Sequence, residues 1–263
     1  MTKNYMISYK LVNPIARLLI WFLSFTTACS SRQYNTHLNK KTTLNQKTSN
    51  VKTKLAQNDR GKHDHINMSN QDLFGNTLLH RAVSNYSPKL VKILVNKQVI
   101  KLNIQNNNGD TPLHLAAANG QLTNVEVLLN ARDIEVNIQN NNGDTPLHLA
   151  VANGHLNLVK RLLNVKNILA NIQNNNGNTL LHLAVAKSNG YLKIVEKLLK
   201  VKGIQVNIKD KQGNAPIHLA VHGKYPDILA TLLKHKKTGL DIDINQPGKN
   251  NNTPLHLALL NEN

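Results

Sequence analysis

Apolar and polar positions recur at a nearly fixed interval from about residue 72 onward. The string "NIQNNNGDTPLHLA" occupies residues 103–116 and returns unchanged at 137–150, and a close copy, "NIQNNNGNTLLHLA", follows at 171–184. One histidine marks each unit. These histidines are separated by 34, 34, 34, 36 and 38 residues, and they are His80, His114, His148, His182, His218 and His256. Such self-similarity is typical of a stacked repeat architecture, so we expect six units over residues 72–263.

Each unit predicts two short helices and a loop. In the second unit Thr111 is a favourable N-cap and Pro112 suits the first helical position, so a helix is expected to about Ala118. After an Asn-Gly break, "QLTNVEVLL" places apolar residues at helical spacing on one face of a second helix. The following "VNIQNNNGD" alternates briefly and contains Asn142-Gly143, a pair favoured in hairpin turns with two positive φ angles. The unit is therefore expected to be helix, helix and protruding hairpin.

The units resemble the ankyrin-repeat family, whose motif is G-x-T-P-L-H-x-A. Residues Gly109–Ala116 and Gly143–Ala150 match that string completely. The other copies depart slightly: Leu78 and Leu180 replace the proline, Ala215 replaces the threonine, and Asn251 replaces the glycine. The resemblance implies an all-α, ankyrin-like α-solenoid of helix-turn-helix repeats with protruding β-hairpin loops.

The repeat domain is predicted to span residues 67–263. Its units are expected near 72–105, 106–139, 140–173, 174–209 and 210–247, with a partial unit at 248–263. Arg81 stands where the other units have leucine, and a polar outer face suits an amino-terminal cap.

The irregular units place their extra residues in connections. The fourth unit has two after its first helix ("AKSNGY"), and the fifth loop is lengthened to "KHKKTGLDIDINQPGKNN". The last unit stops after one helix, which favours a truncated product or a half-cap over a partner-binding edge.

Residues 1–28 have the pattern of a signal peptide. Lys3, Lys10 and Arg17 precede an apolar run at 18–28, which ends in small residues. The run is shorter than the ~20 apolar residues of a spanning helix. We expect a cleaved export signal rather than a permanent anchor. If the segment is not a working signal, the protein would be cytoplasmic.

The sequence "FTTACSS" at 25–31 resembles a bacterial lipoprotein cleavage box. Ala28 and Cys29 match the box, in which the cysteine becomes the lipidated first residue, but Thr26 replaces its usual aliphatic residue. Lipidation at Cys29 and ordinary cleavage after Ala28 both remain open.

Residues 29–66 are predicted to be a flexible basic tether. The segment is rich in Asn, Thr, Lys, Gln and Ser and shows no period, so it cannot bury enough apolar surface to offset its ordering entropy. Half of the +18 net charge lies in the first 58 residues. The tether could contact an anionic membrane surface, although a solvated spacer is the commoner role.

The repeated histidines predict structure rather than chemistry. His114 is the third helical residue, from which a side chain can reach back to cap the first turn. Helices in neighbouring repeats lie about 8–10 Å apart, too far for two such histidines to share a zinc ion at ~2.0 Å from each. No serine or cysteine nucleophile accompanies them at fixed spacing. We expect no catalytic residue, metal or cofactor; the alternative is a histidine-based metal or hydrolytic protein.

Specific nucleic-acid binding is not expected, although the pI is near 10.0. The basic residues of the repeats cluster on the second helices and their ends, and aromatic residues, at 4%, do not interleave with them.

A protein partner is the function that the resemblance implies, through loop tips and first helices. The tip positions are Asn107, Asn108, Asp110, Asn141, Asn142, Asp144, Asn175, Asn176, Asn178, Lys211, Gln212 and Asn214. The first-helix positions are Asn119, Asn153, Lys187 and His222. The asparagine runs could instead be turn formers alone, and a truncated repeat protein without a partner is a further alternative. The sequence identifies neither the partner nor the oligomeric state.

Overall fold

The computed structural model describes residues 70–97, 100–187, 191–237 and 239–261. The predicted signal segment, the tether and Cys29 lie outside the described residues, as do residues 188–190 of the fourth-repeat insertion. Within the described ranges the fold is a stack of helix pairs, which confirms the predicted all-α solenoid.

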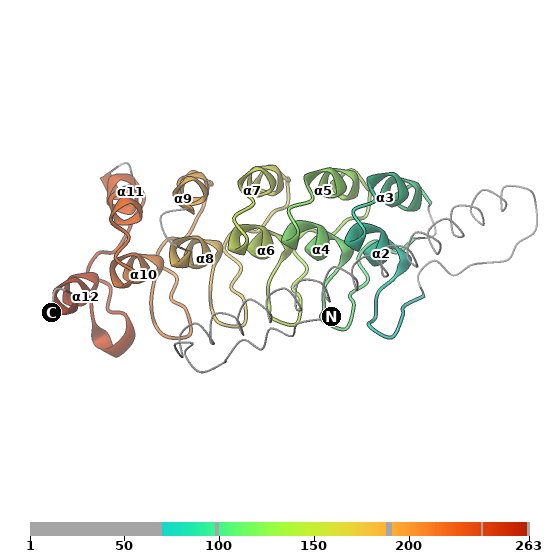
Figure 1. Cartoon of the computed structure of the whole chain (residues 1–263). Coiled ribbons are helices and arrows are strands. Elements are labelled where there is room, and N and C mark those ends of the chain that lie inside the picture. Colours follow the sequence, from blue (N-terminus) through green and yellow to red (C-terminus); the bar gives the residue numbers. More distant parts are fainter. Residues whose placement is uncertain (1–69, 98–99, 188–190, 238, 262–263) are drawn as a thin grey trace, which may run out of the picture. The chain divides into compact units, whose positions relative to one another are not determined.

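The helices form two rows (Figure 1). The first helices of the repeats are α2 (Leu78–Ser84), α4 (Pro112–Ala118), α6 (Pro146–Ala152), α8 (Leu180–Ala186), α10 (Pro216–His222) and α12 (Pro254–Leu260). The second helices are α3 (Pro88–Val95), α5 (Leu122–Leu129), α7 (Leu156–Leu163), α9 (Leu192–Leu199) and α11 (Pro226–Lys237), and a short 3-10 turn, η3 (Lys249–Asn251), precedes α12. From α2 to α10, each first helix packs on its own second helix and on the first helix of the next repeat, and α12 packs on α10.

The first helices begin where the sequence predicts. In α4 the Thr111 side chain accepts a hydrogen bond from the His114 backbone N–H, and Pro112 occupies the first turn. Helix α4 has only seven residues, too few for an isolated helix to persist in water. Burial supplies the rest: Leu113, Ala116 and Ala117 are each 0% exposed. The second helices lack a side-chain cap at Gln121 and His155, so their stability also depends on packing.

The loops differ from the predicted hairpins. Gly143 has a φ of 74°, but Asn142 does not have a positive φ, and residues 136–144 contain no assigned strand. The Gly143 N–H donates to the Asn140 carbonyl oxygen at 2.8 Å. A turn followed by one left-handed glycine is the geometry of three-residue loops. The prediction of two positive φ angles was wrong, because the loop is one residue longer than the two-residue turns that need them.

All the extra residues of the fifth repeat were expected in its loop, and this prediction was only partly correct. Helix α11 has 12 residues, whereas the other second helices have 8, so Lys234–Lys237 extend the helix instead of the loop. In the second and third repeats the helix ends at Asn130 and Asn164. Lysine stands at this position both in α11, at Lys234, and in repeat four, at Lys200, where α9 nevertheless ends at Leu199, so the lysine alone does not explain the extension.

The second helix of repeat two contains a polar defect in the core. Asn124 is 0% exposed and occupies the position of Leu158, which is 2% exposed in the next repeat. Its Nδ2 donates to Gln121 Oε1 at 2.8 Å, but its Oδ1 has no hydrogen-bond partner. A buried polar atom without a partner costs about 1–3 kcal/mol.

Replacing this pair with its third-repeat counterparts should stabilise the fold. We expect Gln121→His/Asn124→Leu to raise the free energy of unfolding by about 1–3 kcal/mol, because it removes the unpartnered oxygen and adds buried apolar surface. Urea titration followed by circular dichroism measures the change. The single variant Asn124→Leu is the control and should gain less, since it leaves Gln121 Oε1 unpaired. A double variant no more stable than wild type would contradict this account.

Candidate protein-binding surface

The motif histidines join neighbouring repeats as well as capping their own helices. The Thr111 N–H donates to His114 Nδ1 at 3.1 Å, and the Thr111 hydroxyl lies 2.8 Å from the same nitrogen. On the other side of the ring, Nε2 lies 3.0 Å from the carbonyl oxygen of Asp144 in the next repeat. The predicted capping role is confirmed at this histidine, and the bridge between repeats is a second role that the sequence did not reveal.

These partners determine the protonation state of His114. A backbone N–H can only donate, so Nδ1 carries a lone pair, and a carbonyl oxygen can only accept, so Nε2 carries the hydrogen. Burial lowers the pKa of His114, which favours this neutral form. Both ring nitrogens are already in use, so neither is available to a metal ion or substrate.

The same arrangement recurs along the stack. The Nε2 atoms of His80 and His182 lie 2.9 Å from carbonyl oxygens of the following repeat, at Asp110 and Asn214. Those of His148 and His218 lie 3.1 and 2.9 Å from the carbonyl oxygens of Ile172 and Gln246, in the loop that leads into the following repeat. At Ala215 the threonine hydroxyl is missing, but the Ala215 N–H still donates to His218 Nδ1. His256 in α12 makes the cap alone and is exposed. In the described part of the chain, no group of three or more His, Cys, Asp or Glu residues could hold a metal ion.

The string "NIQNN" forms a ladder of side-chain amides between repeats. In the first copy, Asn103 Nδ2 donates to the Asp133 carbonyl oxygen at 2.7 Å, and Gln105 Nε2 donates to that of Gln139 at 2.9 Å. Asn106 Nδ2 and Asn107 Nδ2 reach back to the preceding repeat, at Asn76 Oδ1 and the Leu73 carbonyl oxygen. The asparagine run therefore holds adjacent loops together, in addition to forming each turn.

Several predicted tip residues belong to this ladder. Asn141 and Asn175 donate from Nδ2 to carbonyl oxygens of the preceding tip, as Asn107 does. The Asp110 carboxylate accepts from Asn140 Nδ2 at 2.8 Å, and Asp144 accepts from Asn174 Nδ2 at the same distance. Asn214 is 9% exposed. A partner would have to compete with these hydrogen bonds.

Other predicted tip residues present free side chains. Among the described residues, these side chains are exposed and make no hydrogen bond: Asn108, Asn142, Asn176, Lys211 and Gln212. Asn178 is half-buried, and its N–H donates to Asn174 Oδ1. On the first helices, Asn119 and Asn153 bond to carbonyl oxygens, whereas Lys187 and His222 are exposed.

A row of leucines on the first helices was not among the predicted site residues. Each lies one position after the motif histidine and is half-buried, whereas the leucine or isoleucine one position before the histidine is at most 2% exposed in α4, α6, α8 and α10. The row consists of Leu115, Leu149, Leu183, Leu219 and Leu257, and we call it the leucine row. A leucine directly after the motif histidine in five units, next to the positions expected to be buried, was the signal in the sequence that could have identified this row. Arg81 replaces leucine in α2 and pairs with Asp72 at 2.9 Å.

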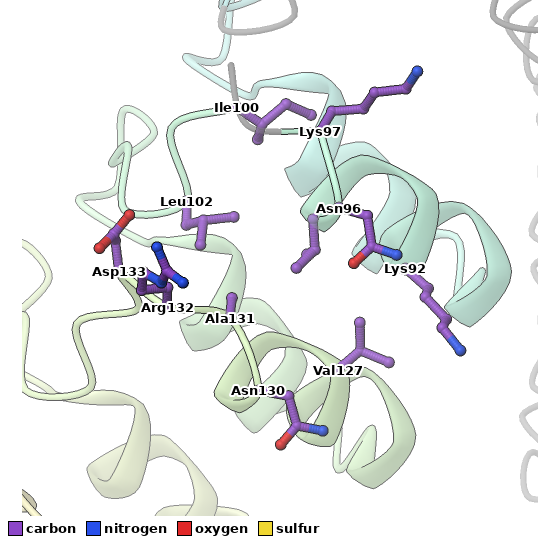
Figure 2. Close-up of a pocket in the computed structure, with 11 residues that line it drawn as sticks. Lys92, Asn96, Lys97, Ile100, Leu102, Val127, Asn130, Ala131, Arg132 and Asp133 are labelled. Atoms are coloured by element: carbon purple, nitrogen blue, oxygen red, sulfur yellow. The ribbon is translucent and has the colours of Figure 1, made fainter.

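A hollow of about 650 Å³ lies between the C-terminal ends of α3 and α5 (Figure 2). Ala131 borders it where the next two repeats have Val165 and Val201. The ends of Lys92 and Lys97 point away from the hollow. Polar and charged side chains also line it, at Asn96, Asn130, Arg132 and Asp133. The two methyl groups by which alanine is smaller than valine account for only a small part of the hollow's volume.

Comparison with known proteins identifies the family. The model for ankyrin repeats matches residues 45–140, 132–210 and 185–263. The chain belongs to the ankyrin-repeat family. The first match begins at residue 45, inside the stretch predicted to be a tether. Ankyrin repeats are usually non-catalytic and bind protein partners.

Solved structures agree with the ankyrin fold. The ankyrin repeat domain of Bcl-3, a member of the IkappaB protein family, has a TM-score of 0.67 and 24% identity over 80% of this chain and 86% of that chain. The ankyrin repeat protein EF0377 has a TM-score of 0.63 and 28% identity over 73% of this chain and 94% of that chain. A search of curated proteins found no match. In the described residues of this ankyrin protein, no helix is long and apolar enough to cross a membrane.

Removing one bridging histidine should cost more than removing a histidine that only caps. We expect His114→Ala to lower the free energy of unfolding by about 2–4 kcal/mol, because a buried carbonyl oxygen and N–H lose their partners. The control, His256→Ala, should cost only about 0.5–1 kcal/mol. Because the pKa of folded His114 lies below its unfolded value of 6.5, its contribution is full above pH 6.5 and is lost as the pH falls through the folded pKa. Denaturant titrations at pH 7.5 and 5.5 should thus show a smaller His114→Ala effect at pH 5.5. Equal costs for the two variants would refute the bridging role.

Proposed function

We propose that the chain is a non-catalytic protein-binding scaffold that holds its partner on the first helices and the loop tips. The leucine row supports this most directly. Five repeats present a half-buried leucine at one equivalent position, beside loop tips with free polar side chains. A partly accessible apolar strip with a polar margin is the usual anatomy of a protein interface.

Within this surface the binding energy should fall on the leucine row and on the free tips. An amide that already bonds its neighbour gains little from a partner, since binding would only exchange one hydrogen bond for another. Asn108, Asn142 and Asn176 therefore suit partner contacts better than Asn107, Asn141 and Asn175. Lys211 and Gln212 continue the free tips into repeat five.

Affinity capture of the tagged full-length chain, followed by mass spectrometry, should identify a specific partner. We expect Leu149→Gln/Leu183→Gln to weaken that partner's binding at least ten-fold, because central apolar contacts dominate interface energy. The control is Asn157→Gln, at an exposed position of α7 outside the proposed surface, and it should bind as wild type. Circular dichroism checks that both variants are folded. Unchanged affinity in the leucine variant would move the site away from the first helices.

The proposal extends to location through the amino-terminal sequence. Lys3, Lys10 and Arg17, followed by the apolar run at 18–28, support export, and Cys29 after Ala28 supports a lipid anchor. A lipidated chain would hold its repeats at a membrane surface through the basic segment. The protein would then meet its partner there.

Labelling with radioactive palmitate tests the anchor. Expressed in a bacterial host, the wild-type chain should incorporate label and fractionate with membranes, because the cysteine thiol is the acceptor of the lipid in such signals. Cys29→Ala should lose both properties, and Ser30→Ala is the matched control that should keep them. An unlabelled wild-type chain would rule out lipidation, and an uncleaved soluble chain would rule out export.

A further inference from the structure

The leucine row has small side chains beside it. Ala118, Ala152 and Ala186 lie three residues after the leucines of α4, α6 and α8, one helical turn along the same face. None of the three is fully buried. The exposed face of these helices is thus a ridge of leucines bordered by alanines, which leaves space for a second element to approach the backbone.

The spacing of the ridge selects the kind of element. Neighbouring packed helices lie about 8–10 Å apart, so successive leucines are separated by about that distance along the stack. An α-helix rises 1.5 Å per residue, so side chains seven residues apart share one face and are about 10.5 Å apart. A partner helix lying across the first helices could place one apolar side chain against each repeat.

Extended partners fit the ridge less well. In a β-strand, residues three apart span about 10 Å but point to opposite faces. A polyproline helix has a suitable period, but its recognition uses aromatic-lined grooves, and the ridge is built from leucine and alanine. The α-helix therefore suits this surface best.

The distribution of charged residues along the stack predicts which end of the partner helix is acidic. Repeats one to three carry the carboxylates Asp72, Asp110 and Asp144 in their loops. The later repeats also carry loop carboxylates, at Asp210, Asp241 and Asp243, of which Asp210 accepts the Gln212 and Asn214 N–H groups. The same repeats present four exposed lysines at loop tips and first-helix ends, namely Lys187, Lys211, Lys224 and Lys249, and these outnumber the carboxylates. Acidic residues would be attracted to the later repeats and repelled by the earlier ones.

We propose that the partner segment is an amphipathic α-helix with a large apolar residue at every seventh position and acidic residues at the end that lies over repeats four to six. This inference rests on the proposed function and specifies the chemistry of the partner. Contacts with four leucines, from Leu115 to Leu219, need a helix of about 22 residues, or roughly 32 Å.

Synthetic helices test the inference on the full-length chain. The probe is a fluorescein-labelled, alanine- and glutamine-rich peptide with leucine at every seventh position and four glutamates at one end. Its isomer has the same composition with leucine at every fifth position, which scatters the leucines around the helix. By fluorescence anisotropy we expect the first peptide to bind at least ten-fold more tightly than the isomer. Equal binding of the two peptides would overturn the proposal.

Two variants locate the binding. Leu149→Gln/Leu183→Gln should weaken the first peptide at least ten-fold, and Lys211→Glu/Lys249→Glu should weaken it about three- to ten-fold at low salt and less at high salt. The Asn157→Gln control should bind as wild type. Unchanged peptide binding in the leucine variant would also overturn the proposal.

If a captured natural partner depends on the leucine row while neither peptide binds, the proposed function stands and the helical partner is rejected. If the captured partner ignores the leucine row, the proposed function itself fails.

Discussion

The structure depends on a histidine that uses both of its ring nitrogens. Nδ1 accepts from the threonine N–H at the start of its own helix, and Nε2 donates to a carbonyl oxygen of the next repeat. One side chain therefore stabilises both the beginning of a helix and the position of its neighbour. Seven-residue helices are marginal alone, and this coupling makes each one depend on the stack.

The amide ladder applies the same principle to the loops. Asparagine and glutamine carry both donors and acceptors, so one side chain can bond within its turn and also reach a neighbouring loop. Asn106 does this: its Oδ1 accepts from the Asn108 and Asp110 N–H groups, while its Nδ2 donates to Asn76. The nearly identical loops are explained by this requirement, because each copy must be both donor and acceptor to identical neighbours.

Function is left to the side chains that this scaffold does not use. The motif histidines and the amides of the ladder are occupied by structure, so the ridge of leucines and the unbonded tip residues are the surface available to a partner. The contrast between Leu113 and Leu115 illustrates the division. Two positions apart on one helix, the first is 0% exposed and the second is half-buried.

The sequence by itself determined the local features of this protein. Unit length is visible in the repeat period itself. The Thr-Pro start of α4, α6 and α12, the capping role of His114 and the site of each turn follow from contacts within four residues, which a sequence pattern records directly. The tertiary structure decided what depends on stacking: the carbonyl partner of His114, the amide ladder and the burial of Asn124. The hydrogen bonds of His114 and of the ladder join atoms roughly thirty residues apart, and they are set by how one repeat is rotated onto the next. The leucine row belongs to the same class, because only that rotation decides which of the two leucines on a first helix is buried and which stays half-buried.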